Sequence, residues 1–182
     1  MTMTARPAEP EIPDELITYY LQITGRSQFK PAFLEDAAEI TIMEMQQRDI
    51  RFYKFLYSAV GEGWRWRDRI VMPEDQLQAL IQKPETSIYV LYAEGVPAGY
   101  FELERQGENT ELAYFGLRPE FVGRGYGKHL LSAAIDRAFE DGCARLWVHT
   151  CNLDAPEALD NYQKRGFQIY ETRVEPMPQR YV

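Results

Sequence analysis

The chain has 182 residues, 45% of them hydrophobic, which suits one compact domain with a full core. Its formal net charge of −8 argues against a broad nucleic-acid surface or binding to anionic lipid. The same charge favours a cationic substrate such as an amine. No segment reaches the roughly eighteen apolar residues of a membrane helix, and the N-terminus lacks the pattern of a signal peptide. We therefore expect a soluble, cytoplasmic protein.

Two cysteines and two histidines are the whole supply of sulfur and imidazole ligands in the chain. Cys143 and Cys151 are too few for a disulfide framework, and they form no Cys-x-x-Cys pair. We expect no metal site.

The first half of the chain predicts a leader, two strands and two helices. Residues 1–13 are polar and proline-rich and predict a flexible leader, followed by one domain over 14–182. Residues 16–23 are rich in β-branched and aromatic side chains and predict an extra strand within an added N-terminal segment, 14–37. The next predicted elements are a strand over 39–45, a helix over 49–60 and a short helix over 73–81 that ends before Pro84.

The second half predicts a meander followed by alternating strands and helices. The predicted elements are strands over 87–93, 98–105 and 110–118, a helix over 125–140, a strand over 145–152, a helix over 154–165 and a strand over 168–174. In the helix over 154–165, Asp154 is the expected N-cap and Gly166 the expected left-handed residue after the C-terminus. This order predicts an α+β fold of three layers with about four helices.

A glycine loop separates the strand over 110–118 from the helix that follows. Glycines at 123, 125 and 127 aim several backbone N–H groups at one point before a helix N-terminus, where a phosphate would bind. A Walker A loop is excluded, because Val122 replaces its first glycine and His129 follows Lys128. A dinucleotide fingerprint is excluded because Lys128 stands in place of its third glycine.

Two motifs in the same order resemble the GNAT N-acetyltransferase superfamily. The acyl-CoA loop pattern, Gln/Arg-x-x-Gly-x-Gly/Ala, falls on residues 122–127, with Val122 in place of the usual Gln or Arg. A later helix carrying Ala-x-x-x-Tyr and ending in Gly-Phe falls on Ala158, Tyr162, Gly166 and Phe167. The resemblance covers roughly residues 38–176 and implies a mostly antiparallel sheet of six or seven strands, splayed between the fourth and fifth.

The resemblance implies an enzyme that transfers an acetyl group from acetyl-CoA to a primary amine, by direct attack in a ternary complex. The acceptor would be an amine on a small molecule or a peptide, and no metal would take part. Two alternatives stay open: a non-catalytic acyl-CoA-binding or regulatory module, and a transferase of a longer acyl chain. A homodimer through the helices before the second strand and the sheet edge is a further expectation from the family.

The resemblance also implies roles for single residues. The backbone of Phe115 and Leu117 would pair with the pantetheine arm of the co-substrate, and the Leu117 N–H would stabilise the oxyanion. Tyr162 would act as general acid on the departing thiolate, or else would be a core aromatic beside Phe167. The other predicted co-substrate contacts are Val122, Gly123, Arg124, Gly125, Tyr126, Gly127, Lys128 and Asn152.

The general base is left open among three residues. Glu111 comes first, since it falls at the family's glutamate position, and simple alternation places it on one face with Phe115 and Leu117. The alternative is a solvated strand-end glutamate. Glu102 on the neighbouring strand comes second, and His149 comes third. Aromatic faces can bind an amine, so the predicted acceptor contacts are Tyr53, Tyr57, Trp64 and Trp66.

Overall fold

The computed structural model describes residues 12–37 and 39–182, so most of the predicted leader, residues 1–11, lies outside the described residues. The strands are β1 (Glu15–Ile23), β2 (Ile40–Glu44), β3 (Thr86–Ala93), β4 (Val96–Gln106), β5 (Asn109–Leu117), β6 (Arg145–Cys151) and β7 (Gln168–Pro176). The α-helices are α1 (Ile50–Gly61), α2 (Asp68–Val71), α3 (Glu74–Ile81), α4 (Tyr126–Glu140) and α5 (Ala158–Lys164). Short 3-10 helices are η1 (Arg26–Gln28), η2 (Glu62–Trp64), η3 (Pro119–Phe121) and η4 (Gln179–Tyr181).

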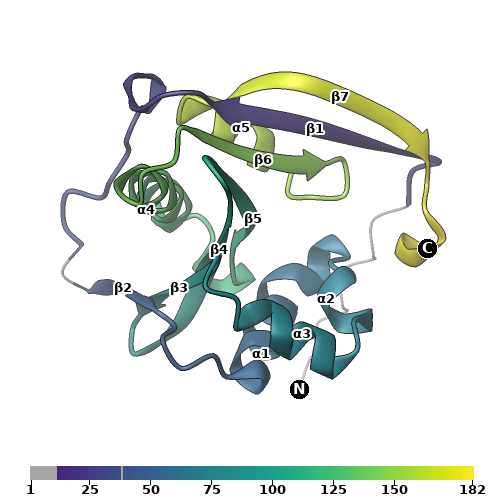
Figure 1. Ribbon diagram of the computed structural model, residues 1–182, viewed down its shortest axis with the longest axis horizontal. Coiled ribbons are helices and arrows are strands. Elements are labelled where there is room, and N and C mark those ends of the chain that lie inside the picture. The colour runs from purple at the N-terminus through teal and green to yellow at the C-terminus, as the bar shows by residue number, and fades with distance from the viewer. Residues whose placement is uncertain (1–11, 38) are drawn as a thin grey trace, which may run out of the picture.

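The seven strands form one sheet in the order β2-β3-β4-β5-β6-β1-β7. Neighbouring strands are antiparallel except β5 and β6, which are parallel. The predicted N-terminal strand is confirmed as β1, and it lies inside the sheet between β6 and β7 (Figure 1). The predicted fold class, with a mostly antiparallel sheet of six or seven strands, is therefore confirmed.

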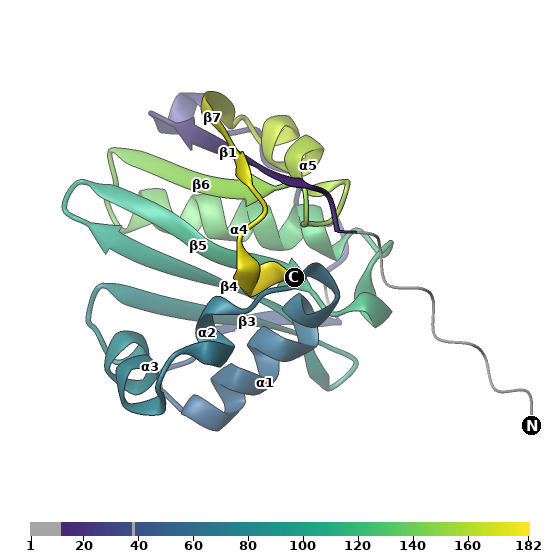
Figure 2. The same ribbon diagram turned by 90° about the vertical axis from the view of Figure 1, so that its right-hand side faces the viewer.

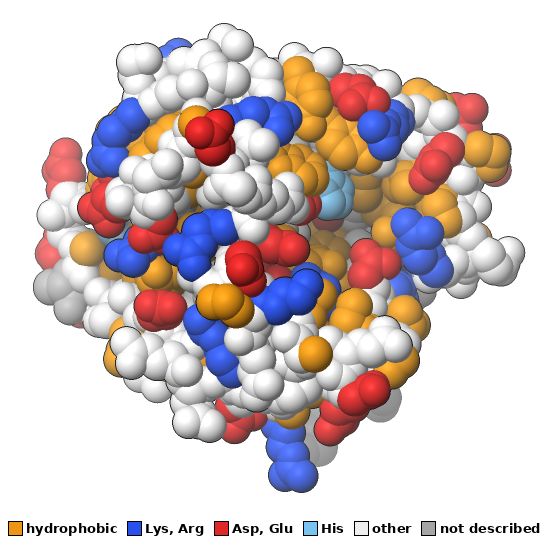
Figure 3. All heavy atoms as spheres, in the orientation of Figure 1, with side chains coloured by type: hydrophobic (Ala, Val, Ile, Leu, Met, Phe, Trp, Pro, Cys, Tyr) orange, Lys and Arg blue, Asp and Glu red, His pale blue; other side chains and the backbone are white. Residues whose placement is uncertain are grey.

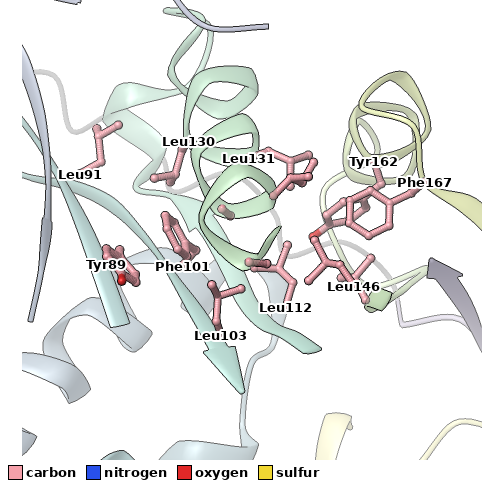
Figure 4. Close-up of a cluster of buried hydrophobic side chains, with 14 of the residues drawn as sticks. Tyr89, Leu91, Phe101, Leu103, Leu112, Leu130, Leu131, Leu146, Tyr162 and Phe167 are labelled. Carbon is pink, nitrogen blue, oxygen red and sulfur yellow. The ribbon is translucent and has the colours of Figure 1, made fainter. Parts of the chain in front are cut away.

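Helices cover both faces of the sheet, which gives the predicted three layers (Figure 2). On one face, α4 and α5 pack through a core that includes Leu130, Leu131 and Tyr162 (Figure 4). On the other face, α1 and α3 pack through a second core that includes Leu56 and Leu77. Both cores rest on burial of apolar side chains from water, which is the main stabilising term in folding.

Local sequence explains where α1 begins and which face it buries. The side chain of Asp49 accepts a hydrogen bond from the Phe52 N–H at 2.9 Å and so caps the helix. Tyr53, Leu56 and Val60, spaced three and four residues apart, are all buried against the sheet. The helix predicted over 49–60 is thus confirmed.

The helix predicted over 154–165 is shorter than expected, because α5 begins at Ala158. Asp154 does not cap it. Its Oδ2 atom instead accepts hydrogen bonds from the Thr150 hydroxyl at 2.7 Å and the Cys151 N–H at 3.0 Å. The carboxylate therefore closes the turn after β6, a competing use of Asp that spacing alone does not reveal.

We predict that Gly166→Ala destabilises the fold by about 2–4 kcal/mol. Gly166 has φ +107°, and an added Cβ would lie 2.0 Å from the carbonyl oxygen of Gln28. Gly142→Ala is the matched control, because φ is +87° there but no atom lies within 4 Å of the added Cβ. Urea unfolding of both variants checks this, and equal losses would contradict the clash with Gln28.

Candidate active site

The parallel pairing of β5 and β6 ends after three residue pairs. The last of these joins Glu111 to Trp147, and the two strands then diverge. The space between them opens into a cavity of about 680 Å³, lined by residues 112–117 of β5 and by Val148, His149 and Cys151 of β6. Figure 3 shows a hollow on this face of the molecule, with hydrophobic side chains inside it and charged ones around it.

A bulge in β5 changes which side chains face the cavity. Leu103 of β4 pairs with Leu112, but Glu102 pairs with Tyr114, so Ala113 has no partner on β4. Leu112 and Phe115 consequently lie on the same side, packed with the α4 core. The predicted alternation is therefore wrong, since Glu111 faces the side opposite to Phe115 and Leu117.

The bulged strand leaves backbone donors facing the gap. The Arg118 N–H donates to the Ala98 carbonyl of β4 at 2.8 Å. Because amides alternate in direction along a strand, the N–H groups of Phe115 and Leu117 point the other way, toward the space that β6 has left. The family resemblance implies that these two backbone positions pair with the pantetheine arm of the co-substrate.

One end of the cavity lies at the glycine loop and the N-terminus of α4. Gly125 has φ +80° as the helix N-cap, and an added Cβ would approach Leu34 to 3.1 Å, so a larger residue would strain this turn. Val122 and Gly127 line the cavity directly. Lys128 is exposed and has no ion pair among residues 12–37 and 39–182. Free helix N–H groups and this ammonium suit an anion.

Arg124, by contrast, is already paired. Its Nη1 atom donates to Glu94 at 2.8 Å, and its guanidinium lies 5.1 Å from the ring centre of Phe121. Both members of the Arg124–Glu94 pair are largely exposed, so the pair costs little to break.

Tyr162 lies both in the α4–α5 core and on the cavity wall. Its ring packs against Phe115 and Phe167, with centroids 6.0 and 5.6 Å away. Burial, helped by the nearby Asp154 carboxylate, raises the pKa of the phenol well above its usual value. The hydroxyl is therefore protonated at neutral pH and can donate a proton or a hydrogen bond. Tyr162 is thus a core aromatic and a residue of the cavity wall at the same time, so the two alternatives do not exclude each other.

The side chain of Asn152, the predicted pantetheine contact, forms its hydrogen bonds outside the cavity. Its Oδ1 accepts from the Ile17 N–H at 3.0 Å, and its Nδ2 donates to the Glu15 carbonyl at 2.9 Å. The side chain thus extends the pairing of β6 with β1 and is absent from the cavity wall. Asn161 of α5 is the asparagine that lines the cavity.

Two of the three candidate bases form a contact with each other. His149 lines the cavity, and its Nδ1 lies 3.4 Å from Oε1 of Glu111. Oε2 of Glu111 accepts from Gln106 Nε2 at 3.0 Å, and Oε1 of Gln106 accepts from the Trp147 indole N–H at 3.3 Å. These contacts lie at the point where β5 and β6 diverge. Glu111 itself does not line the cavity, so it reaches the site through His149.

The remaining candidate base, Glu102, is fully buried behind the cavity wall. It accepts hydrogen bonds from the Tyr53 hydroxyl at 2.6 Å and from Arg69 Nη2 at 3.0 Å. Burial raises its pKa, and Arg69 and Tyr53 act in the opposite direction. Neither Glu102 nor Tyr53 lines the cavity. Their network supports the residues that do, because the Arg69 backbone N–H donates to the Tyr57 hydroxyl at 3.3 Å.

The far end of the cavity is aromatic. Of the predicted acceptor contacts, Tyr57, Trp64 and Trp66 line it. The Trp66 ring lies 5.4 Å from Tyr57 and 5.1 Å from Tyr114, and its indole N–H donates to Asp154 at 3.3 Å. The glycine loop and this aromatic end thus belong to one continuous cavity that passes the strand gap.

The model of the Acetyltransferase (GNAT) family matches residues 51–167. This span includes the glycine loop, both diverging strands and Tyr162. The chain belongs to the GNAT acetyltransferase family.

Relatives of this GNAT chain include a curated protein and two solved structures. Spermidine N(1)-acetyltransferase of Thermoplasma acidophilum is 23% identical over 149 residues, which are 71% of this chain and 91% of that protein. A GCN5-related N-acetyltransferase of Sphaerobacter thermophilus has a TM-score of 0.67 at 16% identity, over 89% of this chain. The chain spans 51% of that structure, about half its length. An aminoglycoside acetyltransferase from an uncultured soil metagenomic sample has a TM-score of 0.59 at 17% identity, over 70% of this chain and 88% of that one.

Several residues that line this GNAT cavity were not predicted from the sequence. Tyr114 could have been found, since it lies in the strand before the glycine loop. Tyr20, Arg180 and Tyr181 also line the cavity, but they come from β1 and η4, which only the folded sheet brings to the site. η4 is attached there by the Arg65 guanidinium, which donates to the Tyr181 carbonyl at 3.3 Å.

Within the described ranges, no helix is both long and apolar enough to cross a membrane. In the same part of the chain, no group of three or more His, Cys, Asp or Glu side chains could hold a metal ion.

We predict that Arg69→Met destabilises the protein by about 3–5 kcal/mol, because it leaves the Glu102 carboxylate buried without its cationic partner. Lys54→Met, which removes the exposed contact with Glu74, is the control and should leave the unfolding midpoint nearly unchanged. Urea unfolding measures both. A similar small effect of the two changes would show that the buried pair does not support the fold.

Proposed function

We propose that this protein is an acetyl-CoA-dependent N-acetyltransferase acting on a primary amine. The observation that supports it most is the alignment of three features along one cavity. The glycine loop lies at one end, the diverging strands and Tyr162 lie in the middle, and the aromatic wall lies at the other end. The proposal includes a cytoplasmic localisation, since the co-substrate is an intracellular metabolite.

The residues present suit acetyl-CoA. The loop N–H groups over 123–127 and the α4 N-terminus would hold its phosphates, with Lys128 adding charge. Val122 has no long polar side chain, so this binding would rest on backbone donors. The Phe115 and Leu117 amides, free of β6, would pair with the pantetheine arm, and Asn161 replaces Asn152 as its side-chain contact. When bound, acetyl-CoA supplies the acetyl group as a thioester.

The chain's own groups then meet the chemical needs of acyl transfer. The Leu117 N–H lies where it can donate to a developing oxyanion. Tyr162, which lines the cavity, is the group that would donate a hydrogen bond and then a proton to a departing thiolate. The acceptor amine would attack the thioester carbonyl directly, in a ternary complex. Transfer of a longer acyl chain is the alternative function for the same site.

We assign the general base to His149, with Glu111 as its positioning residue. With Nδ1–H directed at Glu111, the imidazole presents a bare Nε2 that can take a proton from the attacking amine. Gln106 and Trp147 hold Glu111 in turn, in the manner of partners that orient a catalytic group. Glu102 is not part of this assignment, because Tyr53 and Arg69 occupy its oxygens.

The acceptor class that fits best is a small cationic amine. Trp64, Trp66 and Tyr57 offer ring faces, which attract ammonium groups. Glu175 and Asp68 add carboxylates to the cavity wall, where Arg180 contacts Asp68 at 3.5 Å and interacts electrostatically with Glu175. A spermidine acetyltransferase and an aminoglycoside acetyltransferase among the relatives agree with this class.

Calorimetric titration with acetyl-CoA, combined with a thiol-release assay on a panel of amines, tests the function. We expect acetyl-CoA to bind with a roughly micromolar dissociation constant, about −8 kcal/mol, and NADH not to bind. Tyr162→Phe should lower kcat about 100-fold and leave acetyl-CoA affinity unchanged, since only the proton is lost.

Tyr89→Phe is the matched control, because Tyr89 is a buried tyrosine of the same core that does not line the cavity. Binding of acetyl-CoA with no turnover on any amine would favour the non-catalytic module instead. Absence of acetyl-CoA binding would overturn the proposal.

The role of His149 as general base can be tested by substitution. His149→Gln should lower kcat about 100-fold with an unchanged KM for acetyl-CoA, and Glu111→Gln should lower it about tenfold. The double variant should lose no more than His149→Gln alone, because Glu111 acts through the imidazole. Steady-state rates of the native protein and the three variants measure this.

The chain's other histidine provides the control. His129 accepts a hydrogen bond from the Leu34 N–H at 3.1 Å and does not line the cavity, so His129→Gln should keep the native kcat. Full activity of His149→Gln with a large loss in Glu111→Gln would return the role of base to the carboxylate.

A further inference from the structure

The short helix η4 bridges the two halves of the sheet at the aromatic end of the cavity. It follows β7, which belongs to the half that includes β6 and β1, and it lies beside η2 and α2 on the other half (Figure 2). Two contacts hold it there. The Arg65 guanidinium donates to the Tyr181 carbonyl at 3.3 Å, and Arg180 Nε lies 3.5 Å from Asp68 Oδ1. All four residues line the cavity, so η4 is part of its wall.

The backbone of Arg65 has an unusual conformation. Among the described residues other than glycine, positive φ occurs at Arg65, with φ 59°, and at Glu94, with φ 53°. Glu94 precedes Gly95 in the tight turn between β3 and β4, where positive φ is expected. Arg65 follows η2, and the left-handed position after a helix usually belongs to glycine, because a Cβ is unfavourable there. An arginine in this place indicates a task for its side chain.

The left-handed turn at Arg65 brings two tryptophans to the cavity. After Arg65 the chain folds back, and the Trp66 N–H donates to the Gly61 carbonyl at 3.1 Å. The Trp66 ring packs directly on Gly61, where an added Cβ would lie 2.3 Å from the indole. Trp64 and Trp66, on either side of Arg65, both line the cavity. One turn thus presents both aromatic faces and the guanidinium that holds η4.

Tyr181 extends from this anchor across the end of the cavity. Its carbonyl is bound by Arg65, and its ring centre lies 4.6 Å from the guanidinium of Arg180. The residue is half-buried, and burial raises the pKa of its phenol. The Cys151 thiol at the end of β6 acts on that pKa in the same direction, so the phenol lies within electrostatic range of β6. Tyr181 therefore lies between η2 and the end of β6.

The hydrogen bond from Arg65 is the contact that fixes η4 best. The side chains of Arg180 and Asp68 are each 51% exposed, and ion pairs between exposed groups contribute little. Arg65 is half-buried, so its hydrogen bond is better shielded from water. Met177 stays attached to the body of the protein, because its N–H donates to the Asp14 carbonyl at 2.9 Å. Loss of the Arg65 contact would therefore release only the residues after 177.

We propose that Tyr181 sets the length of the acceptor amine and that Arg65 is the residue that positions it. An amine that contacts Trp64 and Trp66 would meet the Tyr181 ring at its far end. A wall of this kind selects by length, because each methylene group that fits or fails to fit changes kcat/KM about tenfold or more. The inference rests on the proposed function and narrows the acceptor class to short primary amines.

A series of linear primary amines from propylamine to octylamine tests the role of Tyr181. The native protein should favour the short members. In Tyr181→Ala, kcat/KM for octylamine relative to propylamine should rise about tenfold, since the wall has been shortened. Acetyl-CoA affinity should stay native, because Tyr181 lies away from the glycine loop. Tyr92→Ala is the matched control: Tyr92 is also half-buried but lies outside this cavity, so the native length preference should persist.

Arg65→Gly tests the positioning role. Glycine accepts the left-handed backbone, so this change removes the hydrogen bond to Tyr181 and keeps the turn. It should raise KM for propylamine about tenfold, with kcat and acetyl-CoA affinity unchanged. Arg65→Lys keeps a donor and should restore most of the native KM. Urea unfolding should give native midpoints for these variants, whereas a merely structural role of Arg65 would lower the midpoint.

Two readouts separate this inference from the proposed function. Turnover with the native length preference in Tyr181→Ala, or a native KM in Arg65→Gly, would overturn the inference and leave acetyl transfer intact. Calorimetric binding of the same amines requires no turnover. If no amine is acetylated, a shift of binding toward octylamine in Tyr181→Ala would still support the role of Tyr181, and an unchanged binding preference would overturn it.

Discussion

The rest of the structure depends on how soon β5 and β6 stop pairing. Parallel strands normally bury their amide groups against each other along their whole length, yet these two share only three pairs. The donors left on β5 need a partner, and an extended ligand between the strands can provide one. Every other element of the site is arranged about this opening: the loop before α4 at one end, α5 along its side, and α1 and η2 at the far end (Figure 1).

A buried ion pair supports the aromatic end of this opening. Arg69 and Glu102 are both shielded from water, and such a pair is tolerated only where further hydrogen bonds satisfy the two groups. The guanidinium lies 5.1 Å from the ring centre of Tyr114, and the Arg69 N–H holds the Tyr57 hydroxyl. Arg69 therefore contacts two aromatic residues of the cavity wall, Tyr114 through its guanidinium and Tyr57 through its backbone N–H. Charged groups in this fold act on the site from behind the wall as well as on its surface.

Sequence patterns predicted most of the fold, because local signals were strong. The strand over 16–23, the helix over 49–60 and the helix after the glycine loop each follow from patterns within a few residues of one another, and the structure confirms all three. Features that depend on distant parts of the chain were not predictable in this way. The bulge at Ala113 shifts the register of β5 against β4, and so it reverses the expected face of Glu111. The contact between Glu111 and His149, and the hydrogen bonds that draw Asn152 to β1, exist only when β1, β5 and β6 are assembled.

The position of β1 has a consequence for how the chain reaches its native state. β1 covers residues 15–23, but its two neighbours, β6 and β7, come from the much later residues 145–151 and 168–176. Apolar residues of β1 such as Leu21 and Ile23 therefore stay unpaired in the sheet until residues 145–176 have been synthesised. Contacts so distant in sequence close slowly, since a long loop loses entropy before any pairing compensates. The half of the sheet that includes β6, β1 and β7 is thus the natural place for a late folding step and for chaperone binding during synthesis.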